Sequence, residues 1–143
     1  MGYKINSTWT KLRERDIEKL NKIIDDEYCN ELEIGRKLNL MDKLTKAFDK
    51  ELATIDFDII TNYMEMNNWT WAMYKNGKSF YKVPSKEYII DSLRNETLKH
   101  ALFNIIELKK KEYYVESGGL VFNMGINDDE SSIWCRIYFD IAH

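Results

Sequence analysis

Hydrophobic positions in the first third of the chain recur every three or four residues, the spacing of an amphipathic helix. One such set is Trp9, Leu12, Ile17, Leu20, Ile23 and Ile24. A second set is Ile34, Leu38, Met41, Leu44, Phe48 and Leu52. We therefore predict a helix over residues 8–26, with Ser7 as its N-cap, and a second helix that begins near Gly35 and runs to residue 52.

A short third helix is predicted next, and the pattern then changes its period. Asp56 is a suitable N-cap for this helix, and Asn67-Asn68 ends it. The apolar face of the helix consists of Phe57, Ile60, Tyr63 and Met64. From Trp69 to Tyr74 the side chains alternate as in a strand, and Asn76-Gly77 predicts a tight turn. Phe80-Tyr81 then forms the returning strand.

The longest helix is predicted from Pro84-Ser85 to about Lys111. Its buried stripe is Ile90, Leu93, Thr97, Ala101, Ile105 and Leu108. The lysines at 109–111 suit a helix C-terminus, where positive charge is favourable. A final hairpin follows, with alternating apolar residues on both sides of a turn over residues 127–131. These residues are Leu120, Phe122, Met124 and Ile126 before the turn, and Ile133, Cys135, Ile137, Phe139 and Ile141 after it.

These elements predict an α+β fold, in which N-terminal helices precede a small antiparallel sheet of three to four strands packed on one long helix. Residues 1–55 form an N-terminal helical segment and residues 56–143 the α+β core. The helical segment is either an arm used for oligomer contacts or a cover for the sheet. Because the small open sheet and the helix pair leave apolar surface to cover, we expect a homodimer or an assembly of dimers.

Composition and charge exclude several classes of protein. The 143 residues are 44% apolar and 31% charged, which suits a folded domain rather than a disordered segment. The formal net charge of −3 lacks the basic surplus of a nucleic-acid-binding protein, so no nucleic-acid partner is expected. No window approaches the roughly 18 apolar residues of a membrane span, and the charged N-terminus does not resemble a secretory signal. We therefore expect a cytoplasmic protein.

Motifs for metal, cofactor and nucleophilic chemistry are sparse. The sequence has no G-x-G-x-x-G, no phosphate-binding P-loop and no H-E-x-x-H, so no cofactor is expected. Cys29 and Cys135 are free thiols or a single disulfide, and a zinc site would require both of them to meet His100 and His143. His100 follows Glu96 by four residues, as a surface ion pair or a catalytic base would.

The sparse motifs favour a binding function over catalysis, and one acidic cluster does not change this prediction. The cluster at residues 128–130 is either a solvated hairpin turn or a cation site. Since nothing else in the sequence requires catalysis, we predict a chain that is not an enzyme.

The sequence is unusually rich in aromatic residues. Four Trp, nine Tyr and six Phe make up 13% of the chain. Rings on a sheet can stack on a planar base, an Arg fork can hold a pyrophosphate, and a glycine pair lets backbone approach a ligand. The candidate ligand-binding residues are Trp69, Trp71, Phe80, Lys82, Arg94, Gly118, Gly119, Trp134, Arg136 and Tyr138. The alternative is cross-strand aromatic packing beneath a covering helix.

Four short motifs carry a family resemblance over roughly the last 90 residues. They are Asp56-Phe57, Asn68-Trp69-Thr70-Trp71, Val83-Pro84-Ser85 with Lys86-Glu87, and Ser117-Gly118-Gly119. In these motifs the chain resembles small phage proteins, and among them the first type of Thoeris anti-defence protein. The resemblance implies an oligomeric, non-enzymatic protein that binds a cyclic ADP-ribose isomer made by bacterial TIR-domain proteins. Such a protein sequesters the immune signal in the infected bacterium.

Two other hypotheses belong to different functional classes. One is an anti-CRISPR-type inhibitor that acts through a protein–protein interface, and the other is a small hydrolase that cleaves the signal. A concave site with Arg136 or Arg94 at its floor would favour sequestration. A flat aromatic patch beside an acidic face would favour the protein inhibitor.

Overall fold

The computed structural model describes residues 12–27, 31–105 and 110–141, and it confirms the predicted α+β class. The helices are α1 (Glu14–Glu27), α2 (Glu31–Leu52), α3 (Phe57–Met66), α4 (Lys86–Ser92), the π-helical segment η2 (Leu93–Leu98) and α5 (Lys99–Phe103). The strands are β1 (Trp71–Lys75), β2 (Lys78–Lys82), β3 (Glu112–Ser117), β4 (Leu120–Ile126) and β5 (Ile133–Phe139). Three of the described helices therefore come first in the chain, and the rest of them lie between the β1–β2 hairpin and strands β3 to β5.

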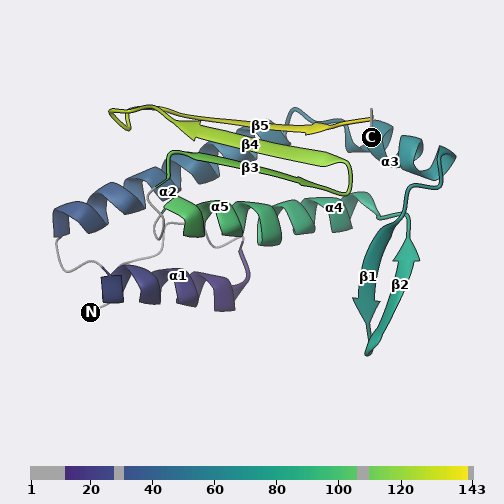
Figure 1. Ribbon diagram of the computed structural model, residues 1–143, viewed down its shortest axis with the longest axis horizontal. Coiled ribbons are helices and arrows are strands. Elements are labelled where there is room, and N and C mark those ends of the chain that lie inside the picture. The colour runs from purple at the N-terminus through teal and green to yellow at the C-terminus, as the bar shows by residue number, and fades with distance from the viewer. Residues whose placement is uncertain (1–11, 28–30, 106–109, 142–143) are drawn as a thin grey trace.

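The sheet of β3, β4 and β5 lies over a helical layer (Figure 1). The rod formed by α4, η2 and α5 runs along the sheet, and α1 packs on the far side of this rod. Arg13, just before α1, donates its backbone N–H to the Asn95 side chain at 3.0 Å, and Lys19 lies 5.3 Å from the Phe103 ring. The order of layers is thus sheet, central rod and α1.

Helix α2 packs beside β5 and covers the same side of the sheet. Phe48 of α2 meets Phe122 of β4 at a ring separation of 6.2 Å, and both rings are buried. The Ile137 amide of the outer strand β5 donates to the Glu51 carboxylate at 3.2 Å. Burying one large apolar side chain stabilises a fold by about 1.5–3 kcal/mol. Residues 31–52 therefore serve as a cover for the sheet, one of the two roles expected of the N-terminal segment.

One hydrophobic core joins the helices of both halves of the chain. It includes Leu20 and Ile24 of α1, Leu44 of α2, Met64 of α3 and Phe122 of β4, all almost fully buried. Alternation decides which strand residues enter it, so every second residue of β4 and β5 points inward. The alternation also predicts that Ile133, Cys135, Ile137 and Phe139 share the inner face, and this prediction is confirmed. Ile141, the last residue of the alternating series, lies beyond β5 and is 60% exposed.

The predicted caps and turns of the middle region are confirmed. The Asp56 carboxylate accepts N–H groups of Asp58 and Ile59 at the start of α3, and the Ser85 hydroxyl accepts the Tyr88 N–H at the start of α4. Asn76 and Gly77 have φ values of 53° and 78°, the left-handed pair of a two-residue hairpin turn. The predicted cap Ser7 and the first residues of the helix expected from Thr8 lie outside the described residues.

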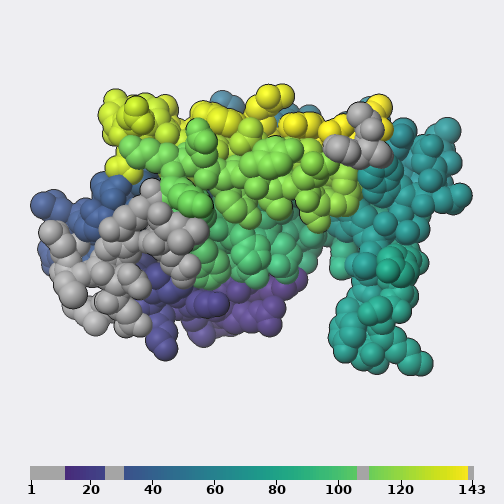
Figure 2. All heavy atoms as spheres, viewed as in Figure 1, coloured from purple at the N-terminus to yellow at the C-terminus, as the bar shows by residue number. Residues whose placement is uncertain are grey.

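The β1–β2 hairpin is a separate two-stranded sheet, so the single sheet of up to four strands divides into sheets of two and three. It projects from one end of the molecule as a narrow lobe (Figure 2). Tyr74 and Tyr81 are 73% and 76% exposed there, and no residue of β2 is buried. We call this hairpin the ribbon.

The region after residue 92 differs from the predicted single helix. The rod contains the π-helical segment Leu93–Leu98, and Lys110 and Lys111 are not helical. Residues 112–117 form strand β3, which the sequence analysis did not assign. No helix that the structure describes is long and apolar enough to cross a membrane.

Candidate functional site

The two tryptophans of the Asn-Trp-x-Trp motif converge on the tight turn between β3 and β4. Trp69 and Trp71 each donate their indole Nε1–H to the Gly118 carbonyl oxygen at 3.1 Å. Gly118 and Gly119 have φ values of 62° and 88°, and a Cβ on Gly118 would lie 2.3 Å from the Trp71 Nε1. The close approach expected at this glycine pair is therefore made by indole rings.

Trp69 and Trp71 have different surroundings. Trp69 packs against Phe139 and Tyr63, at ring separations of 5.1 and 6.2 Å, in an aromatic cluster between α3 and the end of β5. Trp71 contacts Tyr88 edge-on at 6.2 Å and also borders a hollow beside the rod. Trp69 thus has the packing role left open in the sequence analysis, whereas Trp71 faces a cavity.

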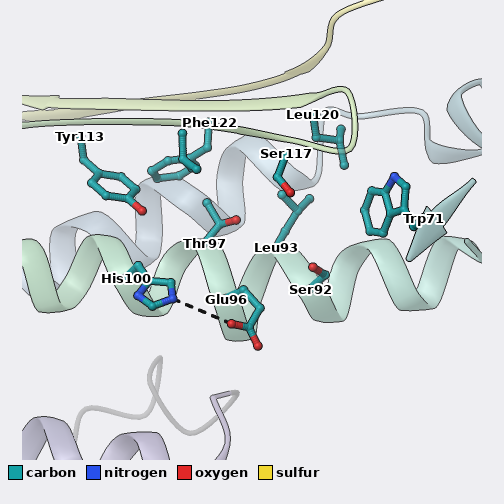
Figure 3. A pocket seen from close by; sticks show the side chains of 11 residues that line it. Trp71, Ser92, Leu93, Glu96, Thr97, His100, Tyr113, Ser117, Leu120 and Phe122 are labelled. Carbon is teal, nitrogen blue, oxygen red and sulfur yellow. Dashed lines mark ion pairs between the residues drawn. The ribbon is translucent and has the colours of Figure 1, made fainter. Parts of the chain in front are cut away.

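This cavity, which we call the β3–η2 cleft, lies between strand β3 and the π-helical part of the rod (Figure 3). Its volume is about 340 Å³, within the size range of small-molecule sites. The residues that line it are Trp71, Ser92, Leu93, Glu96, Thr97, His100, Tyr113, Val115, Ser117, Leu120 and Phe122. A neighbouring hollow shares Trp71, Ser92 and Ser117 with the cleft, so the Trp71 ring borders both.

Helical spacing on the rod and alternation along β3 place these side chains on the two walls of the cleft. Ser92, Glu96 and His100 are four residues apart, so they lie along one face of the rod. Tyr113 and Ser117 alternate along β3 with residues of the opposite face. The cleft therefore combines hydroxyl groups from helix and strand with aromatic and aliphatic walls.

Tyr113 supplies both a ring and a hydroxyl to the cleft. Its ring packs edge-on against Phe122 at 5.9 Å. Burial raises the pKa of the Tyr113 phenol, so this hydroxyl stays protonated and can donate a hydrogen bond at neutral pH. A ring and a donor at the same position suit a ligand with both planar and polar parts.

Basic side chains surround Glu96 at the side of the cleft. Its carboxylate lies 3.7 Å from the Arg13 guanidinium, 3.5 Å from the Lys99 ammonium and 3.9 Å from His100 Nε2. Glu96 and His100 are both about half exposed, so these pairs stay open to solvent. Arg13 and Lys99 thereby offset the negative charge of Glu96, although they also pair with Asp91 and Asp16 and do not themselves line the cleft.

The π-helical segment is held by the buried side chain of Asn95. Asn95 is 3% exposed, donates to the Asp91 carboxylate at 2.8 Å and accepts the Arg13 backbone N–H. π-helical turns are rare and are found frequently at functional sites. Here the turn occupies the stretch of rod that lines the cleft.

The other predicted ligand-binding residues lie elsewhere. Phe80 and Lys82 are on the exposed ribbon. Arg94 points to another side of the rod, where it lies 3.6 Å from Asp49 and borders a more open hollow. The structure therefore does not bring the ten predicted residues into one site, and Trp71 is the one that lines the cleft.

Trp134, Arg136 and Tyr138 point away from the core, as their alternation predicts. Together with Tyr114 of β3 they form a surface that we call the outer face. Trp134 and Tyr138 are 48% and 41% exposed, and the Arg136 guanidinium lies 5.4 Å from the centre of the Tyr138 ring. Glu112 and Glu116 of β3 lie in the same two rows of the sheet as Trp134 and Tyr138.

Cysteine and acidic residues do not form a metal site in the described part of the chain. No group of three or more His, Cys, Asp or Glu there could hold an ion. Cys135 is a buried free thiol, and burial raises its pKa to about 12. Cys29 and His143 lie outside the described residues. In the acidic loop, hydrogen bonds from the Ser131 side chain and from its backbone N–H lower the pKa of Asp129.

Comparison with family models, curated proteins and solved structures finds no match to this chain.

Proposed function

We propose that the protein binds a nucleotide-derived immune signal, of the cyclic ADP-ribose isomer type, in the β3–η2 cleft. The observation that supports this most is the combination of three aromatic rings with a set of hydroxyl groups around about 340 Å³. Stacking on an aromatic ring contributes about 1–3 kcal/mol per base. The resemblance to phage anti-defence proteins supplies the class of ligand.

Each part of such a ligand has a chemical counterpart in the cleft. In this proposal the base stacks on Trp71, and the ribose hydroxyls pair with Thr97, Tyr113 and Ser117. The anionic part lies near Glu96, whose negative charge is offset by Arg13 and Lys99. The protein would then hold the signal intact in the cytoplasm of an infected bacterium.

Titration calorimetry on the full chain tests this function. We expect saturable binding of at least one cyclic ADP-ribose isomer. We also expect the ligand to be recovered unchanged after heat denaturation of the complex. Recovery of a cleaved product would show a hydrolase instead. Lack of binding to these isomers, and to cyclic di- and trinucleotides, would overturn the proposal.

The outer face supports a second candidate, a protein inhibitor that acts through an interface. Trp, Tyr and Arg are enriched in interface hot spots, and this face presents Trp134, Arg136 and Tyr138 on an open sheet beside two glutamates. This is the flat arrangement expected of an anti-CRISPR-type inhibitor. Under this alternative, Arg136→Ala and Trp134→Ala abolish capture of a host or phage protein, whereas Tyr113→Phe does not.

A further inference from the structure

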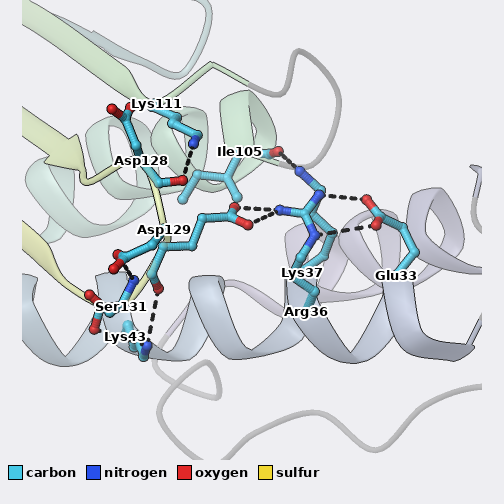
Figure 4. A network of polar contacts seen from close by, with 10 residues as sticks. Glu33, Arg36, Lys37, Lys43, Ile105, Lys111, Asp128, Asp129 and Ser131 are labelled. Atoms are coloured by element: carbon cyan, nitrogen blue, oxygen red, sulfur yellow. Dashed lines mark hydrogen bonds and ion pairs between the residues drawn. The ribbon is translucent and has the colours of Figure 1, made fainter.

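A second cavity lies between α2, the end of the rod and the loop between β4 and β5, and several basic residues line it. Figure 4 shows the polar contacts that Arg36, Lys37 and Lys111 make in this region. The volume of the cavity is about 180 Å³, and its charged lining consists of Arg36, Lys37, Lys110, Lys111 and Glu130. Aliphatic side chains of Leu40, Ile105 and Ile126 complete the wall. Among the described residues, four cations and Glu130 line this cavity, and Glu33 pairs with Arg36 beside it, so the local balance of these residues is positive.

Lys37 contributes a buried charge to this wall. The residue is only 2% exposed, and its ammonium group donates to the Ile105 carbonyl oxygen at 3.0 Å. Ile105 lies in the helical turn directly after α5, and its carbonyl oxygen is a hydrogen-bond acceptor for this ammonium group. This contact compensates part of the cost of burying an ammonium group and fixes its charge beside the cavity.

Arg36 presents a guanidinium that is already bound to carboxylates. It pairs with Glu33 at 2.6 Å, and its Nη1 bonds both oxygens of the Glu130 carboxylate. These bonds to Glu33 and Glu130 raise the pKa of Arg36. The arginine therefore holds a two-oxygen anion at the edge of the cavity, and in this structure the anion belongs to the chain itself.

Cations also hold the loop that carries Glu130. Lys43 donates to the carbonyl oxygens of Glu130 and Ser131 at 3.3 and 3.2 Å, and Lys111 donates to that of Asp128 at 2.6 Å. These bonds use backbone oxygens, so the Glu130 carboxylate can leave Arg36 without freeing the loop.

We propose that this cavity is a binding site for a phosphate-type oxyanion, either free phosphate or the phosphate end of a nucleotide. The anion takes the place of the Glu130 carboxylate on Arg36 and gains the nearby charges of Lys37, Lys110 and Lys111. The site lies apart from the β3–η2 cleft and does not depend on the function proposed for that cleft.

Calorimetry with inorganic phosphate and with AMP, at constant ionic strength, tests the site on the full chain. We expect binding of at least one of them at one per chain, and the comparison tells which source the site accepts. Glu130→Gln removes the competing charge and should tighten binding about fivefold or more, because a neutral amide pairs weakly with Arg36. Lys110→Gln should weaken binding about tenfold. Tyr113→Phe, in the cleft, should have no effect.

Lys50→Gln is the matched control, because Lys50 is an exposed cation on the same helix as Arg36 and does not line the cavity. Its phosphate affinity should equal that of the wild type. Circular dichroism confirms that each variant is folded. The proposal is overturned if neither wild type nor Glu130→Gln binds phosphate or AMP. Equal losses in Lys50→Gln and Lys110→Gln would overturn it as well.

Discussion

Gly118 has a left-handed backbone conformation and lies in close contact with an indole ring. Its φ of 62° is unfavourable for any side chain, and an added Cβ would lie 2.3 Å from the Trp71 Nε1. Gly118→Ala should therefore lower the free energy of unfolding by about 2 kcal/mol or more, measured by urea denaturation. Gly35→Ala is the control, since Gly35 lies in α2 with nothing within 4 Å of an added Cβ. That variant should gain about 0.5–1 kcal/mol, and equal losses in both variants would contradict the role given to the turn.

Burial of the Cys135 thiol makes the free energy of unfolding depend on pH in the alkaline range. Burial raises its pKa to about 12 from the ordinary value of 9.0, so the folded protein favours the neutral thiol. The stabilisation is complete below pH 9 and is lost as the pH rises toward 12. The difference in unfolding free energy between wild type and Cys135→Ala should thus shrink by about 2 kcal/mol between pH 8 and pH 10.5. A difference that stays constant over this range would show that the thiol titrates normally in the fold.

At the scale of elements, the ribbon differs from the three-stranded sheet in stability. Two-stranded hairpins are marginally stable on their own, and the ribbon is largely exposed beyond Trp71 and Met73, whereas six of the seven β4 residues are buried. In hydrogen exchange, amides of β1 and β2 should be at least about 100-fold less protected than those of β4. Equal protection would mean that the ribbon is covered in solution, as it would be inside an oligomer.

Local sequence signals predicted most elements, because caps, turns and apolar periods act over a few residues. Asp56, Ser85 and Asn76-Gly77 are examples in which the residue type determines the local backbone. Strand β3 was missed because its exposed residues Glu112 and Glu116 and the preceding lysines resemble the end of a helix. Its strand character depends on pairing with β4, which only the tertiary structure provides.

The candidate site could be predicted only in part for the same reason. The aromatic surplus indicated Trp71, and helical spacing indicated Glu96 with His100. Tyr113 and Ser117 join them through contacts across β3, and Arg13 reaches Glu96 from 83 positions earlier in the chain. The alternation correctly predicted that Arg136 lies on the outward face of β5. That face is on the opposite side of the sheet from the cleft.

For the whole molecule, the outer face leads us to expect an oligomer. Tyr114, Trp134 and Tyr138 expose 58%, 48% and 41% of their surface on one side of the sheet. Large exposed aromatic surfaces commonly mark interaction sites, and a symmetric dimer is the commonest assembly. Light scattering at micromolar concentration should give about 34 kDa or a multiple of it, compared with 17.1 kDa for one chain. A mass of one chain would refute this prediction.

The cleft and the outer face compete as the binding surface, and one titration decides between them. A cyclic ADP-ribose isomer is titrated into wild type, Tyr113→Phe and Arg136→Ala by calorimetry. If the β3–η2 cleft holds the ligand, Tyr113→Phe should bind about fivefold more weakly through loss of one hydrogen bond, and Arg136→Ala should bind as the wild type does. Loss of affinity in Arg136→Ala with unchanged affinity in Tyr113→Phe would place the ligand on the outer face and contradict the assignment of the cleft.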